Sequence, residues 1–135
     1  MDLEVLKIAS NTENSKVIID HTHISKQKNP LCGDEMEISL KVKNKKIVDF
    51  GYQSNSCIYC QASANILSSK SINKSINKIN DITNFALIFF EKKNNFFRGD
   101  WSILNKLFNK KNIARKECLI LPFRALSKAL KQLKK

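Results

Sequence analysis

The chain of 135 residues is long enough for one compact domain and too short for two ordinary ones, so we predict a single domain over residues 1–135. No stretch approaches the roughly 20 apolar residues that span a membrane, and the chain does not start with a basic signal peptide, so we expect a cytoplasmic protein. In the cytoplasm, its four cysteines favour reduced thiols over a disulfide framework. The net charge of +12 comes from 21 Lys and only 3 Arg spread along the chain, which is typical of a solvated basic surface, and we do not expect nucleic acid as a partner.

The first half of the chain predicts a short helix and then a β-hairpin. Asp2–Ala9 has apolar residues at near-helical spacing, and residues 21–28 are interpreted as a polar loop. From Glu35 to Lys43 apolar and polar residues alternate strictly, and the alternation resumes between Lys46 and Tyr52 after a polar turn. We therefore predict an antiparallel hairpin over about residues 35–53.

The second half predicts helices. Ser56 is a candidate cap for a helix over residues 57–69, and Pro122 is placed in the first turn of a final helix. Between them we expect a short helical segment with Ile72, Ile76 and Ile79, a separate one after Asp81, a polar break over 92–100, a helix over 101–108 and a basic connector over 110–116. Because strands come first and helices follow, the predicted class is α+β, a small antiparallel sheet with several helices packed on one face.

Four residues with metal-binding side chains lie at the edges of these elements. Cys32 and Asp34 fall in a turn before the strong strand, and Cys57 falls where the second strand gives way to a helix, whose positive end favours a thiolate. Cys118 is placed just ahead of the final helix, with Arg115 supplying positive charge. Thiolates suit zinc and iron, so these residues are candidate ligands, provided that folding brings them together.

Cys60 and His23 are the remaining candidates. Cys60 forms a Cys-x-x-Cys pair with Cys57, so it is a redox partner, a further ligand or a persulfide relay, although a small core residue is the interpretation we favour. His23 is an outside candidate, because it precedes Cys32 by nine residues in a polar segment.

Taken together, three motifs resemble the U-type iron-sulfur cluster assembly scaffold family, which comprises IscU, SufU and the N-terminal domain of NifU. They are Asn29-Pro30-Leu31-Cys32-Gly33-Asp34, the stretch from Tyr52 to Ala64, and the stretch from Arg115 to Phe123. The resemblance runs from about Ile18 to Leu130 and implies a SufE/NifU-like fold. Glu117 stands where IscU proteins have His, and this feature together with the long interval between Cys57 and Cys118 favours the SufU-like branch.

The resemblance implies a site formed by Cys32, Asp34, Cys57 and Cys118 that holds zinc or a transient [2Fe-2S] cluster. It implies that Cys118, with Cys57 as the second reactive thiol, accepts sulfur from a cysteine desulfurase of the SufS/IscS kind. The resemblance further implies acceptor apoproteins or other assembly factors as partners. It implies a scaffold or sulfur carrier and not an enzyme, although a sulfurtransferase-type activity with the desulfurase fits the same role.

The sequence departs from the family pattern at several positions and leaves alternatives open. Ser54 and Ser56 replace glycines, Cys60 replaces a small serine, and the segment from His21 to Cys32 is short. The main alternative is a structural zinc module that uses all four cysteines, with a basic surface that binds nucleic acid. A third hypothesis is a thiol oxidoreductase in which Cys57 and Cys60 form a reversible disulfide.

Overall fold

The structure, a computed structural model, describes residues 3–29, 33–92 and 94–133, without the side chain of residue 133. Its α-helices and β-strands are α1 (Leu3–Ala9), β1 (His23–Lys28), β2 (Glu35–Lys43), β3 (Lys46–Asn55), α2 (Ile58–Ser71), α3 (Ile76–Leu87) and α4 (Lys116–Leu130). Short 3-10 helices, labelled η, add η1 (Phe89–Glu91), η2 (Gly99–Lys106), η3 (Lys110–Arg115) and η4 (Lys131–Leu133). The fold is therefore α+β, as predicted.

The predicted hairpin is confirmed by the pairing of β2 with β3. The two strands are antiparallel, with Glu35 opposite Asn55 at one end and Lys43 opposite Lys46 at the other. Asn44 and Lys45 connect them with positive φ angles of 52° and 62°, which are typical of the tight turns that match the twist of a hairpin. The alternation in the sequence places the apolar side chains of both strands on the inner face, where Met36, Ile38, Leu40, Phe50 and Tyr52 are buried.

The prediction of a polar loop over residues 21–28 is wrong, because His23–Lys28 forms strand β1 at one edge of a three-stranded sheet. β1 pairs antiparallel with β2, and Ser25 lies opposite Ile38. Its buried positions, His23 and Ser25, are polar. The Ser25 hydroxyl donates to the carbonyl of Ala125 in α4, so the strand lies against a helix through a hydrogen bond that apolar alternation does not signal.

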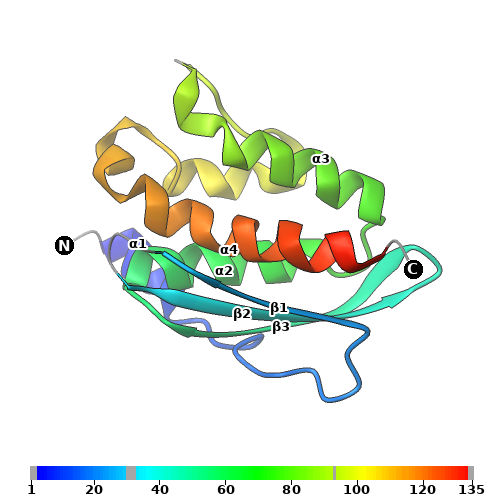
Figure 1. Cartoon of the computed structure of the whole chain (residues 1–135). Coiled ribbons are helices and arrows are strands. Elements are labelled where there is room, and N and C mark those ends of the chain that lie inside the picture. Colours follow the sequence, from blue (N-terminus) through cyan, green and yellow to red (C-terminus); the bar gives the residue numbers. More distant parts are fainter. Residues whose placement is uncertain (1–2, 30–32, 93, 134–135) are drawn as a thin grey trace.

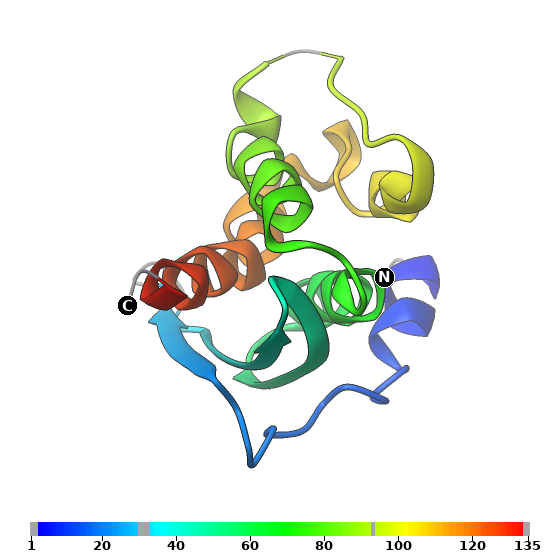
Figure 2. The ribbon, with the colours of Figure 1, turned by 90° about the vertical axis from the view of Figure 1, so that its right-hand side faces the viewer.

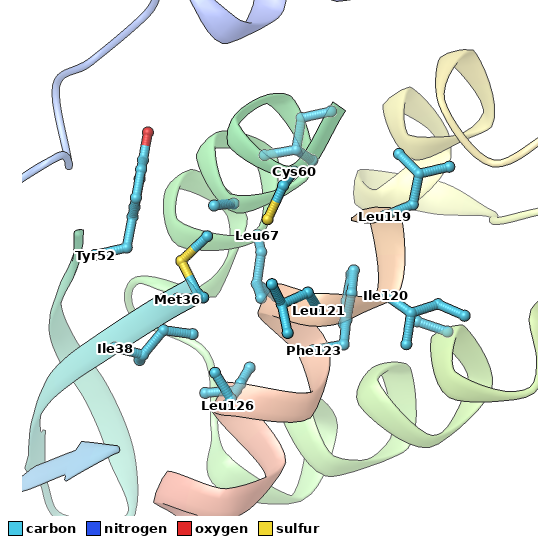
Figure 3. Close-up of a cluster of buried hydrophobic side chains, with 14 of the residues drawn as sticks. Met36, Ile38, Tyr52, Cys60, Leu67, Leu119, Ile120, Leu121, Phe123 and Leu126 are labelled. Atoms are coloured by element: carbon cyan, nitrogen blue, oxygen red, sulfur yellow. The ribbon is translucent and has the colours of Figure 1, made fainter. Parts of the chain in front are cut away.

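Helices cover one face of the sheet. α2 and α4 lie next to one another above the strands, and α3 lies on the side of α4 that faces away from the sheet (Figures 1 and 2). Figure 3 shows Met36 and Ile38 from β2, Leu67 from α2 and Phe123 and Leu126 from α4 meeting in the core between these layers. Along the described part of the chain, no helix has both the length and the apolar character needed to cross a membrane.

The segment between α1 and β1 crosses the opposite face of the sheet. The N–H of Tyr52 donates to the carbonyl of Asn14 over 3.0 Å, and the N–H of Ile18 donates to the hydroxyl of Ser39 over 2.9 Å. A Cβ at Gly51 would lie 2.4 Å from the carbonyl oxygen of Lys16. Glycine at position 51 is therefore required for the close approach of this segment to β3.

The helix boundaries differ from the predicted ones in α2 and α3. The N-cap of α2 is Cys57, not Ser56, and no side chain caps the helix there. α3 is one helix from Ile76 to Leu87, so the predicted separation at Asp81 is wrong. Its N-cap is Ser75, whose hydroxyl accepts a hydrogen bond from the N–H of Lys78 over 3.3 Å.

The final helix begins six residues before Pro122, at Lys116, so the placement of Pro122 in its first turn is wrong. The predicted basic connector before it is η3, and the helix predicted over 101–108 is η2. Pro122 has no N–H and so cannot donate a helical hydrogen bond to the carbonyl of Cys118, four residues earlier. The apolar face of α4 nevertheless follows the prediction, since Phe123, Leu126, Ala129 and Leu130 are all buried.

Candidate functional site

Three of the predicted site residues meet at one point. A carboxylate oxygen of Asp34, the Sγ of Cys57 and the Sγ of Cys118 all lie within 4.8 Å of one another. They come from the segment before β2, the start of α2 and the first turn of α4, so the site is assembled by tertiary folding. The fourth predicted residue, Cys32, lies outside the residues that the structure describes.

Asp34 is placed by hydrogen bonds between the end of β1 and the start of β2. The N–H of Asn29 donates to the carbonyl of Asp34 over 2.7 Å, and the N–H of Gly33 donates to the carbonyl of Asn29 over 2.8 Å. Gly33 has a φ of 77°, in the left-handed region that glycine adopts readily. The motif recognised in the sequence thus holds the Asp34 carboxylate beside the end of the sheet.

Cys57 occupies the N-cap position of α2 in an extended conformation, with φ −74° and ψ 170°. Its N–H donates to Oδ2 of Asp34 over 3.3 Å, and its carbonyl accepts from the N–H of Gln61 over 3.1 Å. The Gln61 side chain returns to the carbonyl of Ser56 over 2.9 Å. Asp34 and the half-buried Cys57 thiol therefore lie at the positive end of a helix, which stabilises negative charge.

Cys118 lies inside the first turn of α4, whereas the sequence placed it ahead of the final helix. Its Sγ is 3.9 Å from Oδ2 of Asp34. The side chain is 8% exposed and packs against the core. The next residue, Leu119, accepts a hydrogen bond at its carbonyl from the Ser63 hydroxyl of α2 over 2.7 Å, so the two helices that present Cys57 and Cys118 are fixed to one another.

The donor set matches a metal with affinity for sulfur. Thiolates select zinc, copper(I) or iron-sulfur centres, and a carboxylate is a harder ligand that both zinc and iron accept. The described part of the site provides two sulfurs and one oxygen. Since four-coordinate zinc and the irons of small clusters each require further ligands, a fourth protein ligand or an exogenous one would complete the site.

Tyr59 and Arg115, which are close in sequence to Cys57 and Cys118, contact one another. The Arg115 guanidinium lies over the Tyr59 ring, 5.2 Å from its centroid, and Arg115 is the N-cap of α4. The sequence indicated the positive charge of Arg115 but missed Tyr59, which lies between the two cysteines of the Cys-x-x-Cys pair. Its position in the first turn of a predicted helix, two residues after Cys57, is the signal that could have identified it.

Cys60 and His23 do not join the cluster of ligand atoms within the described residues. Cys60 is fully buried among core side chains, as Figure 3 shows, which confirms the interpretation of a small core residue. His23 lies in β1 opposite Leu40, and its Nδ1 is 2.7 Å from the hydroxyl of Thr22. Burial lowers the pKa of His23 below its ordinary value.

Comparisons with known proteins agree with this fold and show the family of the chain. The family model described as the NifU-like N terminal domain matches residues 2–92. A relative from Thermotoga maritima, named "Iron-sulfur cluster assembly scaffold protein IscU", is 30% identical over 134 residues, which cover 96% of this chain and 91% of the relative. The region of Cys118, beyond the family match, is included in that alignment.

Two solved structures show the same fold. One, from Fervidobacterium islandicum, is named "Putative iron-sulfur cluster assembly scaffold protein for SUF system" and has a TM-score of 0.87, 23% identity and coverage of 96% of both chains. The other is the N-terminal part of a NifU-like protein from Brucella abortus, with a TM-score of 0.89 and 18% identity, covering 98% of this chain and 93% of that one. The fold is thus that of the U-type scaffold proteins. By its sequence, the chain belongs to the NifU-like N-terminal domain family.

Proposed function

We propose that this protein is an iron-sulfur cluster assembly scaffold, which receives sulfur from a cysteine desulfurase and holds zinc or a transient [2Fe-2S] cluster. The ligands in this proposal are Asp34, Cys57 and Cys118, together with Cys32. The observation that carries it is the convergence of one carboxylate oxygen and two sulfurs within 4.8 Å, from three separate elements. Membership of the NifU-like family and similarity to a relative named as an IscU scaffold support the same function.

Sulfur enters by thiol exchange in this proposal. The Cys118 thiolate attacks the terminal sulfur of a persulfide on the desulfurase, a new S–S bond forms at Cys118, and the desulfurase thiolate leaves. No external oxidant or reductant is needed, because the terminal sulfur is transferred between two thiolates. Cys57 is the second candidate acceptor, since its Sγ lies within 4.8 Å of that of Cys118.

Cargo binding rests on the mixed character of the ligands. Thiolates bind zinc and iron strongly, whereas Asp34 contributes an oxygen that exchanges more readily. When a metal occupies the site, Cys118 has to leave it before that sulfur can attack a persulfide. A site with one weaker ligand suits a protein that must release its cargo to acceptor apoproteins.

The position of Cys60 supports this function over the alternatives. A structural zinc module with four cysteines requires the Cys60 sulfur at the metal, and a redox dithiol requires it beside Cys57 at an accessible position. Cys60 is instead fully buried in the hydrophobic core. Among the described residues, no disulfide joins Cys57, Cys60 or Cys118 to another of these cysteines, which fits the reducing cytoplasm that we propose as the compartment.

The first test measures iron, zinc and acid-labile sulfide in protein purified without oxygen and without an affinity metal. About one zinc per chain without sulfide supports a zinc-dependent sulfur acceptor, and iron with matching sulfide supports a cluster scaffold. Protein that takes up neither metal nor cluster when both are supplied contradicts the proposal.

The second test compares sulfur transfer from a purified desulfurase to the wild type, Cys118→Ser and the control Cys60→Ala. Persulfide on the acceptor is measured by mass spectrometry after brief reaction. We expect Cys118→Ser to lose acceptance while it keeps the circular dichroism spectrum of the wild type, and Cys60→Ala to retain acceptance. Full acceptance by Cys118→Ser would exclude the role of this thiol.

A further inference from the structure

A recess whose lining includes none of Asp34, Cys57 and Cys118 lies between η1, the segment after it, and η2 and η3. It has a volume of about 730 Å³, within the range of pockets that bind small ligands. Its lining is mainly apolar, with Phe89, Phe90, Phe96, Phe108 and Ile113 among the residues that form it. The function proposed above makes no use of this pocket.

Aromatic stacking and side-chain amides hold the walls of this phenylalanine pocket in place. The rings of Phe90 and Phe108 stack with centroids 5.6 Å apart. Asn105 accepts from the N–H of Phe97 over 2.7 Å and donates to its carbonyl over 2.9 Å, which fastens the irregular segment before η2 to η2 itself. Asn95 donates to the carbonyl of Phe89 over 3.0 Å. The pocket is therefore preformed, which lowers the entropic cost of binding.

Apolar side chains also stand exposed at the mouth of the pocket. Phe96 is 51% exposed and Ile113 is 52% exposed, although both line the recess. Large apolar residues that gather at a recess, rather than being scattered singly, mark a surface that another molecule covers.

The charges at the mouth of the pocket indicate what kind of molecule covers it. Lys92 and Lys110 line the pocket, and Glu91 is the acidic residue beside them. Within the described ranges, neither lysine forms an ion pair with a carboxylate. The guanidinium of Arg98 lies 4.7 Å from the centroid of the Phe96 ring and adds positive charge. The chain as a whole carries a net charge of +12, so a second copy would be repelled and an acidic partner attracted.

We propose that the phenylalanine pocket is the docking site for an acidic, amphipathic segment of a partner protein. Apolar side chains of the segment enter between Phe90, Phe96 and Ile113, and its carboxylates pair with Lys92 and Lys110. This mode follows the general pattern in which an apolar face fills a groove while charges at the rim select the partner. The proposal goes beyond sulfur and metal handling and does not depend on them.

The pocket is also connected to the cysteine site through the chain. Ile113 lies in η3, which continues through Arg115 into α4, and Cys118 follows five residues after Ile113. Arg115 in turn lies over the ring of Tyr59, two residues after Cys57. Only four residues of the chain therefore stand between the pocket residue Ile113 and Cys118.

The test uses a fluorescein-labelled synthetic helical peptide with Leu and Phe on one face and Glu on the other, and measures binding by fluorescence anisotropy. We expect saturable binding to the wild-type protein that weakens as salt rises. The same peptide with every Glu replaced by Lys should not bind. Absence of saturable binding up to about 1 mM peptide, the range of the weakest specific complexes, would overturn the proposal.

Matched variants locate the binding. Ile113→Ser and Phe96→Ser should each lower the affinity for the peptide about tenfold or more, as expected for anchors of an interface. Ile19→Ser, at a position outside the pocket that is 94% exposed, should leave the affinity unchanged. Lys110→Glu should also lower the affinity for the peptide, and Lys43→Glu should not. Since all these side chains are exposed, the variants should keep the fold. Equal affinity for Ile113→Ser and the wild type would overturn the proposal.

Two further measurements distinguish other occupants. Sedimentation velocity that reveals a dimer broken by Ile113→Ser would overturn the proposal in favour of self-association. Binding of laurate that the peptide cannot displace would overturn it in favour of a small apolar ligand. Zinc content and sulfur acceptance of Ile113→Ser, measured without the peptide, should equal those of the wild type, so failure of this proposal leaves the proposed function standing.

Discussion

Asp34 and Cys57, 23 residues apart in the chain, are joined by a hydrogen bond from the N–H of Cys57 to Oδ2 of Asp34 over 3.3 Å. The same carboxylate oxygen is 3.9 Å from the Sγ of Cys118. Asp34 therefore contacts the start of α2 at Cys57 and the first turn of α4 at Cys118. It serves as a candidate ligand and also satisfies an N–H group at the start of α2, which no side chain of the helix itself caps.

The first prediction compares Asp34→Ala with Cys60→Ala in zinc affinity. We expect Asp34→Ala to weaken zinc binding at least about tenfold, since even outer-shell partners of a metal contribute this much. Cys60→Ala should leave the affinity close to that of the wild type, because its sulfur is in the core. Competition with a chromogenic chelator measures both. The reverse order would favour the structural zinc module with four cysteines.

The second prediction concerns the order in which thiols react with iodoacetamide in metal-free protein. Cys57 is half-buried, Cys118 is 8% exposed and Cys60 is 0% exposed. We therefore expect Cys57 to be alkylated first, Cys118 more slowly and Cys60 only on unfolding. Peptide mass mapping over time gives the rates. Added zinc should protect Cys57 and Cys118, and protection of neither would argue against both as ligands.

The sequence predicted most of this site because its motifs carry local geometry. Gly33 permits the turn before Asp34, and the change from strand to helical periodicity places Cys57 at a helix start. The approach of Cys118 to these residues could not be derived from spacing, since it depends on how α4 lies across the sheet and α2. Only the resemblance to a known family indicated that Cys118 joins Asp34 and Cys57.

The errors in the predicted fold have a common physical cause, since tertiary contacts outweighed local signals. β1 is polar in sequence and exists because β2 offers it a free edge and α4 accepts a hydrogen bond from Ser25. Pro122 favours the start of a helix locally, yet α4 extends before it because Leu119 and Ile120 are buried in the core. Asp81 does not interrupt α3, where its side chain points to solvent.

The third prediction is a pH dependence of stability caused by His23. Burial lowers the pKa of His23 in the folded protein below the ordinary value of 6.5, so the unfolded chain binds more protons in the range just below that value. The contribution of the neutral His23 ring to the free energy of unfolding therefore has its full value above pH 6.5. This contribution is lost as the pH falls through the pKa of the folded state.

Urea unfolding at several pH values between neutral and mildly acidic measures this effect. His23→Gln should flatten the dependence in that range, whatever its effect on stability at neutral pH. His21→Gln is the matched control, because it removes an exposed histidine from the same part of the chain and keeps the buried ring of His23. A slope that persists in His23→Gln would assign the dependence to other groups.

The fourth prediction concerns Gly51, which holds the segment before β1 against the sheet. In Gly51→Ala the new Cβ would lie 2.4 Å from the Lys16 carbonyl oxygen, a backbone atom that can move only if the segment moves with it. That segment is fastened by the carbonyl of Asn14, which accepts from Tyr52 over 3.0 Å, and by the side chain of Asn14, which donates to Ser68 over 3.1 Å. We expect a loss of about 1–3 kcal/mol in the free energy of unfolding, typical of overpacking at a close contact.

Thermal and urea unfolding measure this loss, and amide hydrogen exchange locates it. Exchange at Ile18 and Tyr52 should accelerate in Gly51→Ala, since both N–H groups donate across this contact. Gln53→Ala, which changes an exposed side chain of the same strand, should have little effect on either measurement. The cysteine site lies on other elements, so zinc affinity should be unchanged in both variants. Unaltered stability of Gly51→Ala would mean that the segment crosses the sheet less closely than described.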